Sequence, residues 1–256
     1  MALFVAASDE SYSRGNSRGH FLYGGFLAPY DDWTGDFAQS WDKNVLSGPP
    51  PIPYLHMSDI RRPEWREKQG NGITRAEGER RVRAAFELIA ETSSLTPIAT
   101  ELNAGHMLDT FTQRIHVRSG GKKKFLPDYL AFIAYVYLVL EFCSRARPEA
   151  EKVDFLVEKS GEITNHIQEF YETMPKSLSS IGAEHLVRLL GEITPGGKER
   201  APLQAADVLC WYSQRFREKN LDDKNIRRYK MIATRKGVRV DLTDHNVSQL
   251  WEAITS

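Results

Sequence analysis

The chain has 256 residues, enough for one large domain or two small ones with a substantial hydrophobic core. Its 34 Lys and Arg residues balance 34 Asp and Glu residues, so no overall charge attracts it to nucleic acid or to a membrane surface, although a local basic patch would suffice for nucleic acid. The sequence shows neither a secretory signal pattern nor an apolar stretch of membrane-spanning length, and Cys143 and Cys210 lie in apolar helical patterns typical of buried thiols. We therefore expect a soluble cytoplasmic protein that does not bind membranes.

Three short apolar runs near the start of the chain have the length of strands. They are Leu3–Ser8, His20–Ala28 and Tyr54–Met57. The first two are expected to pair antiparallel, and the glycine pair at 24–25 indicates a bulge or a close approach of the backbone. Apolar residues then recur every four positions from Trp33 to Val45, which predicts a helix capped by the two preceding aspartates.

The rest of the chain alternates between helical and strand patterns. We predict a surface loop at Arg61–Gly72, helices at Thr74–Thr92, Pro127–Arg147, Thr164–Met174 and Leu203–Arg217, strands at Leu95–Leu102 and Lys152–Glu158, and a small last helix at Asn246–Ile254. The segment Leu186–Thr194 fits either a helix or a strand. Alternation of this kind favours parallel crossovers, so we expect an α/β fold: a mixed sheet of about five strands with flanking helices.

Acidic residues stand at the ends of two predicted strands. Asp9 and Glu10 follow the first apolar run, and Glu158 ends a later strand that should lie parallel to it. Ligands bind outside the carboxyl ends of the strands in open α/β sheets. Asp207 joins these acids if the last long helix begins at the same edge. The alternatives are a turn-initiating Asp9, a solvated strand end at Glu158, and an Asp207 that only favours the helix dipole.

Carboxylates brought together repel one another, and they either take up protons or share a cation. Hard divalent cations such as Mg²⁺ or Mn²⁺ prefer oxygen ligands. Two such ions about 4 Å apart suit phosphodiester hydrolysis, because they activate water and stabilise the leaving oxygen. The sequence therefore predicts a Mg²⁺ or Mn²⁺ site in which Asp9, Glu158 and Asp207 are both the ligands and the catalytic groups.

Other polar residues near these acids are candidates for supporting roles. Glu10 would point to the opposite side of its strand from Asp9, so it is either a further group at the metal site or a solvated residue. Ser11 is interpreted as a turn hydroxyl and Gln204 as a hydrogen-bonding support. His56 and Asp59 are candidates for a proton shuttle and an outer ligand, against ordinary roles in a core or loop.

Several basic and polar runs carry weaker signals. His106, Asp109 and His116 match no metal motif, and the two cysteines form no CxxC pair. Candidate phosphate contacts, each of which is otherwise a solvated face, are Lys122–Lys124 with Arg114 and Arg118, the pair Arg61-Arg62 and the pair Arg80-Arg81.

Two motifs far apart in the chain together resemble a known family. Asp9-Glu10-Ser11 after an N-terminal strand, and Pro202-Leu203-Gln204 followed by Ala206-Asp207, resemble the prokaryotic family called domain of unknown function 3800. Glu158 matches a position where that family tends to have an acid. The resemblance runs from about Leu3 to Phe216, and it implies a ribonuclease H-like fold and, by analogy of fold, a nuclease-like metal site. The ribonuclease H-like domain with its insertions would then be 1–218, with a C-terminal extension at 219–256 packed on it.

The chain departs from the family at two positions. Tyr12 stands where the family usually continues with Gly, and Tyr54 stands where it often has Glu before Leu-His. We expect a divalent-metal-dependent nuclease. The alternatives are a non-catalytic nucleic-acid-binding or interaction protein of a defence or mobile-element system, and an enzyme that hydrolyses a smaller phosphoester. DNA or RNA, a partner protein or a second copy of the chain are the partners that these alternatives imply.

Overall fold

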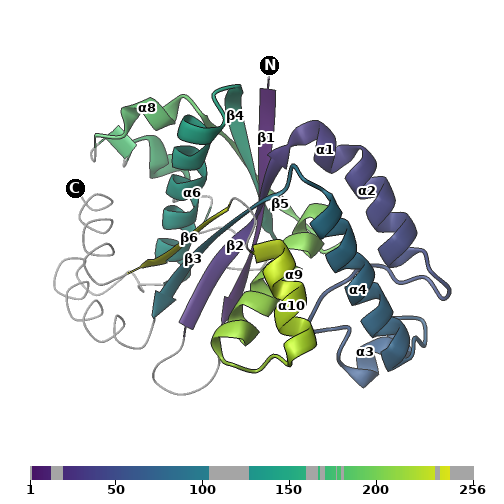
Figure 1. Cartoon of the computed structure of the whole chain (residues 1–256). Helices are drawn as coiled ribbons and strands as arrows, with labels where there is room; N and C mark the ends of the chain where they lie inside the picture. The colour runs from purple at the N-terminus through teal and green to yellow at the C-terminus, as the bar shows by residue number, and fades with distance from the viewer. Residues whose placement is uncertain are drawn as a thin grey trace.

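The computed structural model describes residues 2–12, 20–103, 127–159, 167, 171–176, 178–179, 182–233 and 237–242. A mixed sheet of six strands forms its centre, and helices cover both faces (Figure 1). The strands are β1 (Ala2–Tyr12), β2 (His20–Pro29), β3 (Thr96–Asn103), β4 (Ala150–Glu158), β5 (Leu190–Gly196) and β6 (Val238–Leu242). The helices are α1 (Tyr30–Thr34), α2 (Asp36–Trp41), the π-helical turn η1 (Asp42–Leu46), α3 (Pro63–Lys68), α4 (Arg75–Glu91), α6 (Pro127–Ala146), α8 (Glu184–Val187), α9 (Ala201–Arg217) and α10 (Asp223–Ala233).

The strand order in the sheet is β5-β4-β1-β2-β3-β6. β2 is antiparallel to both of its neighbours, and the remaining pairs are parallel. Five of the six described strands therefore end at one edge of the sheet, with β2 alone reversed. The predicted α/β class, the antiparallel pairing of the first two strands and the parallel pairing of β1 with the strand that ends in Glu158 are confirmed.

Two hydrophobic cores lie on opposite faces of the sheet. Alternate residues of β1 divide between them: Phe4 and Ala6 pack on the side of α6, whereas Val5 and Ala7 pack on the side of α9. Figure 1 shows α6 and α8 on the first side and α1, α2, α4, α9 and α10 on the second. The apolar character of α6 reflects its burial against the sheet, and none of the described helices has the length and hydropathy that crossing a membrane requires.

The predicted third strand at Tyr54–Met57 is wrong. This segment contributes no strand to the sheet, and its backbone donors bond instead to side chains of α9. The N–H of Leu55 donates to Oε1 of Gln204 at 2.8 Å, and the N–H of Met57 donates to Oδ2 of Asp207 at 2.5 Å. Leu55 and Met57 are two positions apart, so their N–H groups point the same way, toward α9. Their acceptors, Gln204 and Asp207, are three residues apart and lie on one face of that helix. The third strand of the antiparallel part is β3, within one residue of the predicted bounds.

The predicted helix across Trp33–Val45 has the right buried face but not a continuous backbone. Gly35 separates α1 from α2, and η1 follows directly after α2. The aspartates expected to cap this helix lie in the first turn of α1, where no side chain caps the N-terminus. All four apolar residues of the predicted stripe are nevertheless buried. The periodicity therefore identified what packs against the sheet but not where the backbone breaks.

The other elements differ from prediction in smaller ways. The loop predicted at Arg61–Gly72 contains α3, and the ambiguous segment at 186–194 divides into the end of α8 and most of β5. In the C-terminal part, α10 packs beside α9 and β6 pairs with β3. Of the helix predicted from Thr164, residues 171–176 are helical, while its start lies outside the described residues, as does the small helix predicted at Asn246–Ile254.

Of the two explanations for the glycine pair, a bulge or a close approach of the backbone, the position of Gly25 favours the close approach. A Cβ atom at this position would overlap the carbonyl oxygen of Ala7. We expect Gly25→Ala to lower the free energy of unfolding by about 3 kcal/mol, because neither strand is free to move within a packed sheet. Urea denaturation measures this loss. A change within about 0.5 kcal/mol would contradict the close approach.

Candidate functional site

Asp9 and Glu158 lie on neighbouring parallel strands. The last paired positions of β1 and β4 are Ser8 and Val157, so the two acids are the next residues along each strand. Ala7 and Leu156, two positions earlier, pack in the core on the α9 side. Since side chains alternate along a strand, Asp9 and Glu158 face that same side. The sequence-based expectation that both acids share one face at the carboxyl ends of their strands agrees with this register.

Asp207 reaches these acids from α9, which crosses the same face of the sheet. The thiol of Cys210 donates to the carbonyl oxygens of Asp9, at 3.3 Å, and Gly24, at 3.2 Å, so this part of the helix lies directly on β1 and β2. Small residues make the approach possible, because Ala206 and Cys210 are fully buried between helix and sheet. Asp207 comes one turn before Cys210. We call Asp9, Glu158 and Asp207 the carboxylate triad.

Two acids of the triad, Asp9 and Asp207, are buried, and Glu158 is half-buried. Asp9 is 5% exposed and Asp207 is 8% exposed. Burial raises the pKa of Asp9 well above 3.8, and the charges of Asp207, Glu158 and Glu10 raise that pKa further. Burial also raises the pKa of Asp207, while nearby His56, the hydrogen bond from Met57 and Lys198 partly offset that increase. Acids that disfavour one another's charge in this way bind protons or a cation more readily than isolated acids do.

The donor set of the triad has the chemistry of a hard divalent cation site. Three carboxylates at one face of the sheet supply the oxygen ligands that Mg²⁺ and Mn²⁺ prefer, and a cation among them would offset the repulsion that, after burial, raises the pKa of Asp9. Within the described ranges, however, no three His, Cys, Asp or Glu side chains already stand close enough together to hold a metal ion. The three residues match such an ion in ligand type and in the face of the sheet that they share, although their side chains do not stand within binding distance of one common ion.

The raised pKa values of Asp9 and Asp207 have a direct consequence for stability. Each folded-state pKa lies above the unfolded one, so the contribution to stability is complete below pH 3.8 and is lost as the pH rises through the folded value. In metal-free buffer we expect the free energy of unfolding to fall over this interval by up to about 1.4 kcal/mol per pH unit for each group. Urea denaturation between pH 4 and pH 8, with Asp9→Asn alongside wild type, measures the fall; an equal slope in the two proteins would contradict it.

His56 and Asp59 form a pair beside the triad. His56 Nδ1 lies 3.0 Å from Asp59 Oδ2, and its Nε2 faces Asp207 Oδ1 at 3.9 Å. A hydrogen on Nδ1 that is shared with Asp59 leaves Nε2 directed at the triad. Ser58 adds a hydroxyl 3.0 Å from Nδ1. The two residues singled out from the sequence as shuttle and outer ligand are therefore brought together next to Asp207.

Lys198 is a residue of this site that the sequence did not reveal. Its Nζ lies 3.4 Å from Asp59 Oδ2 and 3.4 Å from His56 Nδ1. It lies in the turn between β5 and α9, which the hydrogen bond from the N–H of Arg200 to the carbonyl oxygen of Gly197 closes at 3.1 Å. A lysine after a glycine pair and before a long helix is the only local signal for it, and that signal is weak. Lys198 partly balances the acids around it.

Three of the predicted supporting residues have clear structural positions. Gln204 is buried, and its Oε1 accepts from Trp41 Nε1 at 2.8 Å and from Leu55, so it ties α2 and the segment before His56 to α9. The hydroxyl of Ser11 donates to Gln214 of the same helix. Glu10 of β1 lies opposite Tyr23 of β2, and Tyr23 belongs to the core on the α6 side. Glu10 therefore faces away from the triad, as its position in the strand predicts.

The basic candidates divide between positions that the structure describes and positions that it does not. Arg81 is fully buried and bonds to backbone carbonyls, so it is no phosphate contact. Arg61 is partly exposed and pairs with Glu79, whereas Arg62 is exposed and pairs with Asp59. The remaining candidates lie outside the described residues: His106, Asp109, Arg114, His116, Arg118 and Lys122–Lys124.

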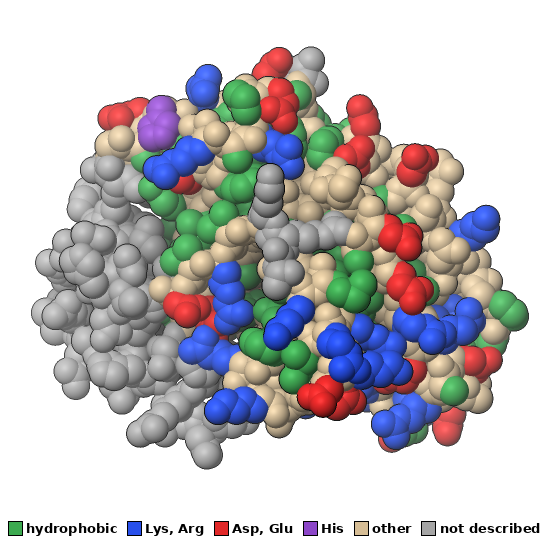
Figure 2. All heavy atoms as spheres, in the orientation of Figure 1, with side chains coloured by type: hydrophobic (Ala, Val, Ile, Leu, Met, Phe, Trp, Pro, Cys, Tyr) green, Lys and Arg blue, Asp and Glu red, His purple; other side chains and the backbone are tan. Residues whose placement is uncertain are grey.

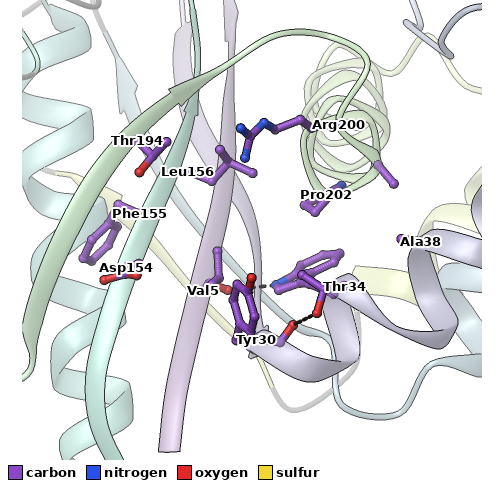
Figure 3. Close-up of a pocket in the computed structure, with 12 residues that line it drawn as sticks. Val5, Tyr30, Thr34, Ala38, Asp154, Phe155, Leu156, Thr194, Arg200 and Pro202 are labelled. Carbon is purple, nitrogen blue, oxygen red and sulfur yellow. Dashed lines mark hydrogen bonds between the residues drawn. The ribbon is translucent and has the colours of Figure 1, made fainter.

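A pocket of about 430 Å³ opens on the same sheet face, at the start of α9 (Figure 3). Val5, Leu156 and Pro202 line its walls, and Arg200 extends across it toward Leu156. Tyr30, at its edge, is 46% exposed. The triad does not line this pocket, although Leu156 stands only two residues before Glu158. The pocket therefore lies next to the acidic site, and the carboxylates of the triad do not form part of its wall.

The resemblance to the family called domain of unknown function 3800 rests on two motifs, one at the end of β1 and one at the start of α9. The fold brings these motifs together, because Cys210 of α9 contacts the backbone of Asp9. Comparison with known proteins adds no test of the resemblance, which stays a prediction. No protein-family model, curated protein or solved structure matches the chain.

Proposed function

We propose that the chain is a divalent-metal-dependent nuclease of the ribonuclease H-like type that uses the carboxylate triad. The observation that carries this proposal is the burial of Asp9 among other acids at the carboxyl ends of adjacent parallel strands. The sheet supports the fold assignment, since β1 lies between the antiparallel pair β2-β3 and the parallel pair β4-β5. The free, buried cysteines agree with a cytoplasmic protein.

The residues of the site have separable tasks in such a reaction. The triad would hold Mg²⁺ or Mn²⁺, and such an ion would activate water and stabilise the departing oxygen. His56 holds its Nε2 at the edge of the triad, where it can take up or deliver a proton. Asp59 fixes the orientation of the imidazole from its other side, and Lys198 in turn donates to Asp59 Oδ2. Gln204 and the Met57 hydrogen bond hold α9 and the His56 segment in register.

Hydrolysis of labelled oligonucleotides tests the proposal. Single- and double-stranded DNA and RNA are incubated with the full chain and Mn²⁺, and a small chromogenic phosphodiester forms a separate arm for the smaller-substrate alternative. We expect cleavage by wild type and its loss in Asp207→Asn. Glu87→Gln is the matched control, because Glu87 is 60% exposed on α4. Cleavage that survives in Asp207→Asn would refute the role of the triad.

A second candidate function is that of a non-catalytic nucleic-acid-binding or interaction protein of a defence or mobile-element system. Basic side chains lie beside the acids, since Arg62 Nη1 is 3.6 Å from Asp59 Oδ1, and contact with nucleic acid needs no metal ion. In that case the triad has a structural role only. Retained affinity for nucleic acid, with no cleavage in Mg²⁺ or Mn²⁺, would support this candidate over the nuclease.

His56 gives a further prediction about the proposed reaction. We expect His56→Gln to lower kcat by about 100-fold, since general acid–base groups contribute at least this much, while KM changes little. Asp59→Asn should lower kcat less, because it only disturbs the orientation of the ring. Steady-state hydrolysis in Mn²⁺ measures both. An unchanged kcat in His56→Gln would show that the imidazole moves no proton in the reaction.

A further inference from the structure

Two arginines stack on one tryptophan immediately beside the triad. Trp211 comes one helical turn after Asp207 on α9, so the two side chains lie along the same side of the helix. The guanidinium carbon of Arg61 lies 4.3 Å from the centroid of the Trp211 ring, and that of Arg215 lies 4.9 Å from it. Cation–π contacts of this kind hold guanidinium groups in fixed positions.

Arg61 also belongs to a basic pocket of about 200 Å³. Arg66 and Arg75 line this pocket with it, and so does Glu79, whose Oε1 lies 3.5 Å from Arg61 Nη1. Three guanidinium groups against one carboxylate leave the pocket with an excess of positive charge. An anionic group in the pocket would reduce the repulsion among these arginines.

The pocket and the stacked arginines form one surface that continues to the His56–Asp59 pair. Arg62 Nη1 lies 3.6 Å from Asp59 Oδ1, and Lys198 Nζ lies 3.4 Å from Asp59 Oδ2. Figure 2 shows Lys and Arg side chains gathered on the face formed by α4, α9 and α10. We define the basic track as Arg61, Arg66, Arg75, Trp211 and Arg215. Its charge is opposite to that of the carboxylate triad it adjoins.

We propose that the basic track binds the phosphate backbone of a single-stranded nucleic acid whose neighbouring phosphodiester reaches the triad. The position of the reacting bond rests on the proposed function; the binding itself does not. Guanidinium groups form forked hydrogen bonds with phosphate, and their planes also stack on unpaired bases. Asp9 and Asp207 are at most 8% exposed, so the reacting group must enter a recess. A flexible single strand can bend into a recess, whereas bending a stiff duplex costs elastic free energy.

Binding in EDTA tests the track separately from catalysis, since no divalent metal is then present. Fluorescence anisotropy of a labelled strand of about 16 nucleotides, as DNA, as RNA and as duplex DNA, is measured over a range of salt concentrations. The test variant is Arg75→Gln with Arg215→Gln, both exposed. The matched control is Arg145→Gln with Arg188→Gln, which removes two exposed charges on the α6 side of the sheet.

We expect the track variant to lose at least about tenfold in affinity for single strands and its salt dependence to weaken by about 0.7 in the log–log slope for each lost phosphate contact. The control should keep wild-type affinity. Equal losses in the two variants, unchanged affinity in the track variant, or a wild-type preference for duplex would each overturn the proposal. A wild-type protein that binds single strands through the track but cleaves none of them in Mn²⁺ would refute the nuclease and support the track.

Discussion

Asp9→Asn is expected to stabilise the metal-free protein and to abolish its response to Mn²⁺. The asparagine keeps the shape of the side chain and removes a charge that burial and three neighbouring acids disfavour. Near neutral pH we expect a gain of about 1 kcal/mol, or about 2–4 °C in melting temperature. Wild type should gain about 2.7 kcal/mol at a Mn²⁺ concentration 100 times its dissociation constant, and the variant should gain none of this.

Activity should change in the opposite direction from stability. Hydrolysis by Asp9→Asn should fall by at least about 100-fold, because even outer hydrogen-bond partners of metal ligands cost about 10–100-fold when they are removed. Differential scanning fluorimetry with and without Mn²⁺, followed by a cleavage assay, measures both effects on one preparation. Glu87→Gln is the control, since Glu87 is 60% exposed on α4, away from the carboxylate triad. A variant that melts lower than wild type without metal, or that still responds to Mn²⁺, would contradict the account.

Arg81→Met is expected to cause the largest loss of stability. Arg81 is fully buried, and its guanidinium donates to the carbonyl oxygens of Val45 at 2.7 Å, Leu46 at 3.1 Å, Gly48 at 2.6 Å and Pro50. Methionine fills similar volume and removes all of these donors, and of the four oxygens that of Leu46 still accepts from the N–H of Ile52 at 3.0 Å. We expect the free energy of unfolding to fall by about 4 kcal/mol, at the upper end for single substitutions.

Two further variants identify the cause of that loss. Arg83→Met removes an arginine that is 53% exposed on the same helix, and it should change stability by no more than about 0.5 kcal/mol. Arg81→Lys should recover only part of the loss, because one ammonium group cannot reach acceptors that the planar fork reaches together. Urea denaturation compares all three. A similar loss in Arg83→Met would assign the effect to charge or helix propensity and not to the buried bonds.

The residues of the acidic site could be predicted because each of them interrupts or ends a local apolar pattern in the sequence. Asp9 and Glu158 end apolar runs of strand length, and topology rules bring such ends to one edge. Asp207 interrupts an apolar helix three residues after Gln204. These patterns locate residues on elements and elements in the sheet. They do not fix how far apart the carboxyl groups stand, because that distance depends on the packing of α9 against β1.

The errors arose where the partner of a segment lies far away in the chain. Tyr54–Met57 has the composition of a strand, but its N–H groups bond to α9, some 150 residues later. Arg81 looks like half of a surface pair, and only the carbonyl groups near Gly48 explain its burial. Lys198 meets Asp59 across 139 positions. The composition of a short window contains no information on such distant partners. The strands that were predicted correctly could be identified from the local run of apolar residues alone.

Diffraction from crystals grown with Mn²⁺, recorded near the manganese absorption edge, tests the central claim most directly. We expect an anomalous peak with carboxylate oxygens of Asp9, Glu158 and Asp207 as its ligands. Crystals of Asp9→Asn grown in the same way should lack that peak. Manganese bound elsewhere, or wild-type crystals with no peak among these three side chains, would contradict the account.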